Sequence, residues 1–243
     1  MKNIAIVLAA GKGSRMNSNI PKPLHIIKGK SLVYTIVEKL YNNNRIDRII
    51  VVVGDFANQI ILNLGDFNDK IDYVIQKEQL GTGHAVKCCK NFLQSKYPFD
   101  RSLILFADCP LLSMKTINNI LDKEGECFSC ICEKKNPTGS GRIFLDSDGK
   151  ILNSIEENDC TNQQKNIKSV NVGIYLIHNS LIIQNIDELK NNNSQKEYYL
   201  PDLLLILIRK EYSVLPIILE NEKELININT KDDLGKANNV RYF

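Results

Sequence analysis

Short apolar runs alternate with helix-patterned segments through about the first 125 residues of this chain. The expected strands are Ile4–Leu8, Arg48–Val53, Tyr73–Ile75 and Leu103–Ala107. Each strand precedes a segment with apolar residues at helical spacing, and these segments begin near Ser31, Asp55, Thr82 and Ser113, of which Asp55 is expected to cap its helix. Parallel strands need long crossover connections, usually helices, so four such units leave few possible folds. The alternation predicts an α/β fold with a doubly wound, mostly parallel sheet.

The pattern becomes less regular after Gly125. Further strands are expected at Phe128–Cys132, Arg142–Leu145, Ile151–Ile155, Val170–Ile177 and Ser213–Leu219, with helical segments around Asn179–Leu189 and Pro201–Arg209. Thr230 followed three residues later by Asp233 resembles a helix-capping pattern. No linker-like tract divides the chain, so we expect one domain over residues 1–243 with two halves, about 1–125 and about 126–243.

The composition excludes several classes of protein. With 43% hydrophobic and 24% charged residues in a chain of 243, a substantial core can form and a disordered chain is excluded. The longest apolar stretches are strand-sized, whereas a membrane helix needs about 20 residues. The start has no signal-peptide cleavage site, so we expect a cytoplasmic protein with no membrane partner. A net charge of +3 is too mild to indicate nucleic-acid binding.

Seven cysteines are spread through apolar segments of the chain. An odd number of cysteines in a mid-sized chain is typical of reduced thiols. Cys127-x-x-Cys130 has no second Cys or His pair near it, and the segment to Cys132 alternates like a strand. Neither zinc binding nor redox chemistry is therefore expected.

A glycine-rich, basic loop follows the first expected strand. This loop, Leu8-Ala9-Ala10-Gly11-Lys12-Gly13-Ser14-Arg15-Met16, lies at the carboxyl end of the sheet, where open α/β folds bind ligands. Gly11 and Gly13 allow the backbone N–H groups to approach anionic oxygens, and Lys12 and Arg15 add positive charge. The loop predicts phosphate binding, with a surface turn carrying incidental charges as the alternative.

Two commoner phosphate-binding motifs do not fit. Met16 stands where the dinucleotide fingerprint needs its third glycine. Gly29-Lys30-Ser31 matches the end of a Walker A loop, but Leu24 stands where that motif needs its first glycine. A nicotinamide-dependent enzyme and a P-loop NTPase are therefore both disfavoured.

The segment Pro21-Lys22-Pro23-Leu24 holds Lys22 between two prolines, which restrict its backbone. Together with the loop Leu8–Met16, it resembles the signature of the nucleotidyltransferases that make sugar nucleotides from a nucleoside triphosphate and a sugar 1-phosphate. The segment Gln76–Ala85, with the sequence QKEQLGTGHA, is similar to the uridylyltransferase domain of the bifunctional bacterial GlmU family. The similarity continues through Pro137–Ile143, Glu156, Asn171–Ile174, Glu197–Tyr199 and Asn227–Thr230.

The resemblance implies a Rossmann-like nucleotidyltransferase sheet with a sugar-binding second half and a C-terminal metal-ligand segment. It implies transfer of uridylyl from UTP to N-acetylglucosamine 1-phosphate, which gives UDP-N-acetylglucosamine and pyrophosphate with Mg²⁺ as cofactor. Arg15, Lys22 and Asp108 are the implied catalytic residues. Lys12 and Arg15 would face the β- and γ-phosphates, and Lys22 the α-phosphate.

Asp108 follows the apolar run Leu103–Ala107, so its carboxylate is expected at the tip of a buried strand, facing the same crevice as the loop. Mg²⁺ is commonly held by one or two protein oxygens together with phosphates and water. The resemblance implies that Asp108 and Asn229 are these ligands. A helix or turn cap is the alternative role for both residues.

The implied substrate-binding residues are Leu8, Ala9, Ala10, Gly11, Lys12, Lys22, Gln76, Gly81, Thr82, Phe106, Ala107, Gly141, Glu156, Asn171 and Asn229. Gln76 offers a donor and an acceptor to the edge of uracil, and Gly81 offers its backbone. Thr82, Gly141, Glu156 and Asn171 match positions around the sugar, with Glu157 as an alternative to Glu156.

The chain also departs from the family pattern. Phe106-Ala107 stands where the family usually has Tyr-Gly, and Val172 replaces the usual Thr, so the sugar preference is less fixed than the nucleotide chemistry. The chain stops at Phe243 without the hexapeptide-repeat β-helix, so we expect no acetyltransferase activity and a monomer or small homo-oligomer. A sister enzyme with another sugar or nucleotide, and a non-catalytic sugar-nucleotide sensor, are the alternatives.

Overall fold

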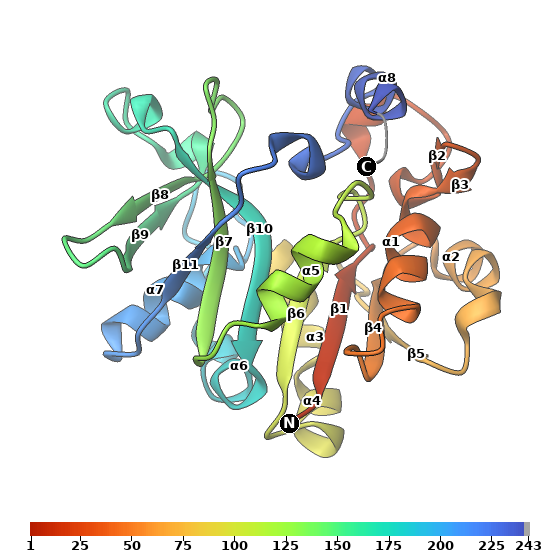
Figure 1. Cartoon of the computed structure of the whole chain (residues 1–243), viewed down its shortest axis with the longest axis horizontal. Helices are drawn as coiled ribbons and strands as arrows, with labels where there is room; N and C mark the ends of the chain where they lie inside the picture. Colours follow the sequence, from red (N-terminus) through yellow and green to blue (C-terminus); the bar gives the residue numbers. More distant parts are fainter. Residues whose placement is uncertain (241–243) are drawn as a thin grey trace.

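The computed structural model describes residues 1–240. Its centre is a nine-stranded sheet with helices packed on both faces (Figure 1). Its strands are β1 (Asn3–Leu8), β4 (Arg48–Val53), β5 (Ile71–Ile75), β6 (Arg101–Phe106), β7 (Cys127–Glu133), β8 (Arg142–Leu145), β9 (Ile151–Ile155), β10 (Ser169–His178) and β11 (Leu215–Ile218). A second, two-stranded sheet consists of β2 (Ile26–Ile27) and β3 (Lys30–Ser31). The α-helices are α1 (Leu32–Tyr41), α2 (Ala57–Asn63), α3 (Thr82–Cys88), α4 (Lys90–Lys96), α5 (Met114–Leu121), α6 (Asn179–Asn185), α7 (Pro201–Arg209) and α8 (Lys231–Asn239).

The strand order creates a switch point beside β1. Across the sheet the order is β11-β7-β10-β6-β1-β4-β5, with β8 joined to β10 and β9 joined to β8. The chain moves from β1 outward to β4 and β5, and β6 then returns to the other side of β1, with all four strands parallel. Their carboxyl ends meet at one edge, and the crevice between β1 and β6 is where such sheets bind ligands. The predicted doubly wound, mostly parallel sheet is confirmed.

Strand β10 runs against the direction of both its neighbours, β6 and β7. Its register against β7 shifts between Asn171 and Tyr175, and Gly173 within this irregularity has a φ of +79°. Such bulges bend a strand and change the direction of its side chains. On the N-terminal side of the bulge, Val170 of β10 pairs with Arg142 of β8. The bend thereby connects the main sheet to the β8–β9 hairpin, which lies at the left of Figure 1.

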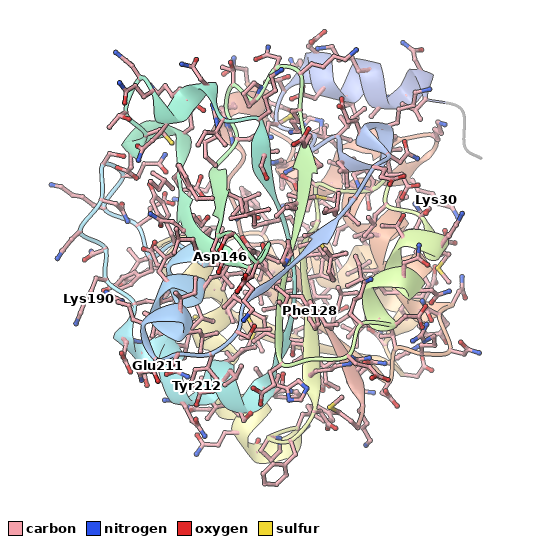
Figure 2. The ribbon with its side chains drawn as sticks, turned by 60° about the vertical axis from the view of Figure 1, so that its left-hand side comes forward. Lys30, Phe128, Asp146, Lys190, Glu211 and Tyr212 are labelled. Carbon is pink, nitrogen blue, oxygen red and sulfur yellow. The ribbon has the colours of Figure 1, made fainter. Side chains whose placement is uncertain are left out.

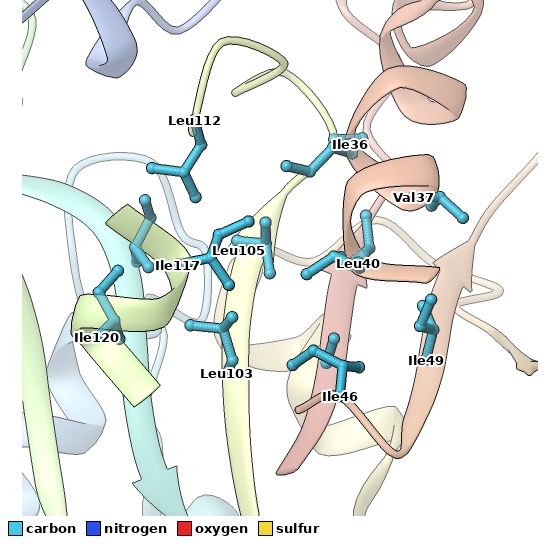
Figure 3. Close-up of a cluster of buried hydrophobic side chains, with 14 of the residues drawn as sticks. Ile36, Val37, Leu40, Ile46, Ile49, Leu103, Leu105, Leu112, Ile117 and Ile120 are labelled. Atoms are coloured by element: carbon cyan, nitrogen blue, oxygen red, sulfur yellow. The ribbon is translucent and has the colours of Figure 1, made fainter. Parts of the chain in front are cut away.

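The core lies on both faces of the sheet because successive strand residues point to opposite sides. In β1, Ala5 and Val7 pack in the cluster that includes α1 and α5, whereas Ile6 packs in the cluster that includes α3, α6 and α7. Figure 3 shows the first cluster, in which Leu103 and Leu105 of β6 lie among side chains of α1 and α5. Strands buried on both faces read as continuous apolar runs, which is why the sequence marks them clearly.

Three helices begin near their expected starts, and a side chain caps each of them. Ser31 and Ser113 accept backbone N–H groups at the starts of α1 and α5. Thr230 and Asp233 form a reciprocal capping box at the start of α8. The expected cap by Asp55 is wrong, because α2 follows Phe56 and has no side-chain cap. Asp55 instead contacts residues of the candidate site, as described below.

Many side chains that end in nitrogen or oxygen point outward from the ribbon (Figure 2). Lys30, Lys190 and Glu211 are exposed, whereas Phe128 of β7 is buried. The cysteines are free thiols, and all except the partly exposed Cys88 are buried. Of the helices in residues 1–240, none combines the length and the apolar character that a bilayer crossing requires.

Candidate active site

A cavity of about 600 Å³ lies at the carboxyl ends of β1 and β6. Every residue that the sequence predicts to bind substrate or metal lines it, namely Leu8, Ala9, Ala10, Gly11, Lys12, Arg15, Lys22, Gln76, Gly81, Thr82, Phe106, Ala107, Asp108, Gly141, Glu156, Asn171 and Asn229. The lining also includes residues that sequence reasoning did not select, among them Gln79, Lys134, Tyr175 and Gln195. Gln79 lies within the motif Gln76–Ala85, whereas no motif contains Lys134, Tyr175 or Gln195, which tertiary contacts bring to the cavity.

The glycine-rich loop forms one wall of the cavity. Gly13 has a φ of +66°, and the backbone turns there into a short 3₁₀ helix, Ser14–Met16. A side chain on Gly13 would collide with the Cβ atom of Lys22. The absence of a side chain at Gly13 thus lets the Pro21–Leu24 segment pack against the loop and brings Lys22 next to it.

A cluster of polar groups closes one end of the cavity. The Lys22 ammonium donates to the Asp108 carboxylate and lies 2.9 Å from Asn229 Oδ1. The same Asn229 oxygen accepts a hydrogen bond of 2.9 Å from Arg15 Nη2. The side chains of Lys22 and Asp108 are only 14% and 16% exposed, so water screens this pair less than an open surface pair. Residues from three distant parts of the chain thus meet at one point.

The segment Asn227–Asn229 lies beside Asp108, where a backbone hydrogen bond to Asp108 and a contact with the first turn of α8 hold it. Ile228 N donates to Asp108 O at 3.0 Å, and Asn229 N donates to Asp233 Oδ2 at 3.1 Å. Asp233 belongs to the capping box that begins α8, at the top of Figure 1. The buried Cys109 thiol also contacts Asn227 Oδ1 at 3.2 Å. The capping contact therefore holds the backbone of Asn229 next to Asp108.

The donor set at this point suits a hard cation. Asp108 offers a carboxylate oxygen and Asn229 an amide oxygen, and both contact one cationic group, the Lys22 ammonium. Within residues 1–240, no three or more His, Cys, Asp or Glu side chains form a group that could hold a metal ion. Two protein oxygens are enough for Mg²⁺, which commonly keeps water and phosphate oxygens as its other ligands. The residues present thus fit a magnesium ion.

Asp55 links the glycine-rich loop to the other wall of the cavity. Its carboxylate lies 3.4 Å from Lys12 Nζ and accepts a hydrogen bond of 3.3 Å from Gln79 Nε2. The Lys12 side chain is 64% exposed, so this ion pair contributes little to stability. It does keep the Lys12 ammonium near the cavity.

Gly81 and Thr82 lie where the two halves of the chain meet. Gly81 has a φ of +109°, and a side chain there would lie 2.6 Å from Tyr198 O. Gly83 N donates to the same Tyr198 oxygen at 2.8 Å, and Leu200 N donates to Thr82 Oγ1 at 3.0 Å. These contacts fix the Glu197–Tyr199 segment against the loop that follows β5. Tyr198 itself is absent from the residues that line the cavity.

The opposite end of the cavity is formed by β10 and β8. Asn171 donates its backbone N–H to Gly141 O at 2.9 Å and its side-chain Nδ2 to Tyr175 Oη at 2.7 Å. Its Oδ1 accepts from Gly173 N at 2.8 Å. The ring of Phe106 packs directly on Gly173, where a Cβ atom would lie 2.5 Å from the ring. Phe106, one of the positions that depart from the family pattern, thus packs against the bulge of β10 at this end of the cavity.

The structure distinguishes Glu156 from Glu157. Glu157 Oε2 forms an ion pair of 2.7 Å with the buried Arg142, away from the cavity lining. Glu156 lines the cavity, and burial together with the nearby Asp202 and Asp159 raises its pKa above the usual carboxyl value. The absence of a side chain on neighbouring Gly141 leaves room for the Glu156 carboxylate.

A family model and several known proteins are similar to this chain over most of its length. Residues 5–195 match the model of the MobA-like NTP transferase domain. The chain is 39% identical to a "Probable UDP-N-acetylglucosamine pyrophosphorylase" of Acanthamoeba polyphaga mimivirus, over 96% of this chain and 94% of that protein. It is 34% and 35% identical to the "Bifunctional protein GlmU" of Alkaliphilus metalliredigens and of Clostridium novyi, over 99% of this chain in each case. The chain spans about half the length of these two bifunctional relatives, 52% of each.

A solved structure shares the fold. It is a candidate glucose-1-phosphate thymidylyltransferase from Bacillus anthracis, solved at 2.76 Å in complex with a sucrose. The two chains superpose with a TM-score of 0.76 over 99% of this chain and 97% of that one, at 17% sequence identity. At this identity the similarity shows the fold alone.

Proposed function

Because the chain belongs to the MobA-like NTP transferase family, we propose that it transfers a uridylyl group from UTP to N-acetylglucosamine 1-phosphate. The products are UDP-N-acetylglucosamine and pyrophosphate. The observation that carries this proposal is the convergence of Arg15, Lys22, Asp108 and Asn229 at one end of a cavity whose other end is polar and less cationic. The first end suits a triphosphate, and the second suits the hydroxyl and acetamido groups of a sugar.

The reaction needs no nucleophile from the enzyme. A phosphate oxygen of N-acetylglucosamine 1-phosphate attacks the α-phosphorus of UTP, and the bond from that phosphorus to the oxygen bridging to the β-phosphorus breaks. Pyrophosphate leaves with the electron pair, and no base is required because the attacking phosphate is already ionised at pH 7. Catalysis then rests on alignment and on neutralising charge between two anions.

The cationic side chains divide this task. Lys22 is proposed to contact the α-phosphate, where charge develops during transfer. Arg15 and Lys12 are proposed to contact the leaving pyrophosphate, and Asp55 holds Lys12 near that position. Asp108 and Asn229 would hold Mg²⁺, which when bound neutralises phosphate charge and orients the triphosphate.

The sugar is proposed to lie against β8 and β10. Asn171 is held by Tyr175 and Gly173, so its amide is fixed in one orientation before a ligand arrives. Glu156 would accept hydrogen bonds from sugar hydroxyls, and Thr82 and the Gly141 backbone would complete the contacts. The cytoplasmic location and the monomeric or small homo-oligomeric state remain predictions from the sequence.

A substrate panel tests the proposal. Purified protein with Mg²⁺ is given each of UTP, dTTP, CTP, ATP and GTP with either N-acetylglucosamine 1-phosphate or glucose 1-phosphate, and nucleotide sugars are separated by chromatography. We expect UDP-N-acetylglucosamine to form fastest. A preference for another pair would identify a sister enzyme. Tight binding of UDP-N-acetylglucosamine without formation of any product would identify a sensor.

A further inference from the structure

The amide of Gln76 is fixed by groups of the protein itself. Gln76 is 4% exposed, and its backbone N–H donates to Val53 O at 2.8 Å. Its side-chain nitrogen Nε2 lies 3.1 Å from Gly81 O. A backbone carbonyl only accepts hydrogen bonds, so the amide nitrogen, and not the amide oxygen, must face Gly81.

The same nitrogen has a second partner in His84. Gln76 Nε2 lies 3.1 Å from His84 Nδ1, on the first turns of α3. One hydrogen of the amide group is donated to Gly81, so the other is available for His84, provided that Nδ1 carries a lone pair and no hydrogen. The imidazole must then hold its hydrogen on Nε2. The ring of Tyr198 lies beside His84, with 6.1 Å between the centroids.

These two contacts decide what Gln76 offers to a ligand. Both amide hydrogens are donated within the protein, so the expected donor of Gln76 is not free for a nucleobase. Among the described residues, no hydrogen bond engages Gln76 Oε1. Since Gln76 lines the cavity, its oxygen is the group left for a base, and it is an acceptor only.

We propose that His84 is a positioning residue that determines base specificity by holding the Gln76 amide with its oxygen toward the nucleobase. This inference rests on the proposed function, because it deepens the choice of nucleotide at the same site. Uracil and thymine carry a hydrogen on N3 and can donate to Oε1, whereas N3 of cytosine is an acceptor and would face it with repulsion. Without His84, only the contact with Gly81 still holds the amide in this orientation, so the amide turns over more readily and its nitrogen can then serve cytosine. A buried polar group that is left unpaired by the wrong ligand gives strong discrimination.

The test uses two substitutions of different chemistry. His84→Asn keeps an acceptor oxygen close to the position of Nδ1, whereas His84→Leu removes the acceptor and keeps much of the volume. Dissociation constants of UTP, dTTP and CTP are measured by equilibrium dialysis with Mg²⁺ and without any sugar phosphate. His178→Leu, at the end of β10 and outside the cavity lining, is the control for loss of a histidine.

We expect the wild type, His84→Asn and His178→Leu to favour UTP over CTP to a similar extent. In His84→Leu the preference for UTP over CTP should fall about tenfold or more. The preference between UTP and dTTP should not change in any variant, because both bases carry the N3 hydrogen. An unchanged UTP-to-CTP ratio in His84→Leu would overturn the proposal, and so would an equal loss in His178→Leu.

If His84→Leu does not fold, the ¹⁵N signals of the imidazole rings decide the question. The chain has three histidines, which simplifies their assignment. The proposal requires Nδ1 of His84 to carry no hydrogen, and a hydrogen found there would overturn it. Binding is measured without the acceptor sugar, so a wild type that selects UTP but makes no UDP-N-acetylglucosamine would refute the proposed function and leave the role of His84 intact.

Discussion

Lys22 is the side chain whose loss should cost the most activity. Its ammonium contacts Asp108 and lies 2.9 Å from Asn229 Oδ1. Because its side chain is only 14% exposed, water has little access to take over the role of the ammonium when the side chain is removed. Removing one preorganised donor to developing charge costs about 2.7–4 kcal/mol of activation free energy. A factor of ten in rate corresponds to about 1.36 kcal/mol, so Lys22→Ala should lower kcat about a hundredfold to a thousandfold.

The assay is the initial rate of UDP-N-acetylglucosamine formation at saturating substrates. Lys22→Met is the matched variant, because it keeps Cβ and Cγ against Gly13 and an unbranched side chain of similar volume, and lacks the charge. Lys236→Ala, which removes a surface lysine paired with Asp232 on α8, is the control. Both Lys22 variants should lose activity equally, and Lys236→Ala should not. Near-normal turnover by Lys22→Met would show that Lys22 acts by packing and would refute the reasoning.

Three further predictions concern stability and reactivity. Gly173→Ala places a methyl group 2.5 Å from the ring of Phe106, at a residue with a φ of +79°. It should lower the free energy of unfolding, measured by urea titration, by about 1–3 kcal/mol. Gly149→Ala, at a residue with a φ of +77° and open space around it, should lower the free energy of unfolding less, and equal losses in the two variants would show that the ring contact is unimportant. Burial, aided by Asp159, raises the pKa of Asp202 from 3.8 to about 6. The folded state thus binds this proton more tightly than the unfolded chain does. Protonation of Asp202 therefore stabilises the fold fully below pH 3.8, and this contribution is lost as the pH rises through about 6. Thermal unfolding of Asp202→Asn should lack this part of the pH dependence, and identical pH profiles for the variant and the wild type would contradict the prediction. Cys88 should react with a thiol reagent before the six buried cysteines, and several fast thiols would argue against this packing.

Local patterns predicted the first half of the fold well. The expected strand Arg48–Val53 matches β4 residue for residue, and the helix expected from about Ser31 is α1, which the Ser31 side chain caps. These features depend on residues close together in sequence, namely a run buried on both faces and an oxygen at a helix start. The resemblance found in the motifs is confirmed by the family match over residues 5–195. It also selected site residues from distant segments, all of which line one cavity.

Contacts between distant segments account for what was missed. The place of β10 between β6 and β7 depends on pairings such as that of Tyr175 with Ile104, which no local period reports. Asp55 was expected to cap a helix, but it lies within reach of Lys12 and Gln79. Likewise, the sequence showed the amide of Gln76 as a donor and an acceptor, whereas the fold uses its donor internally. Such choices are made by tertiary neighbours.

Pyrophosphate release tests the central claim most directly. The purified protein is given Mg²⁺ and UTP, with and without N-acetylglucosamine 1-phosphate, and Asp108→Ala is assayed alongside. The account predicts pyrophosphate only when both substrates are present, in a one-to-one ratio with UDP-N-acetylglucosamine, and a severe loss in Asp108→Ala. Release from UTP alone, or no release from any triphosphate despite binding of UDP-N-acetylglucosamine, would contradict it.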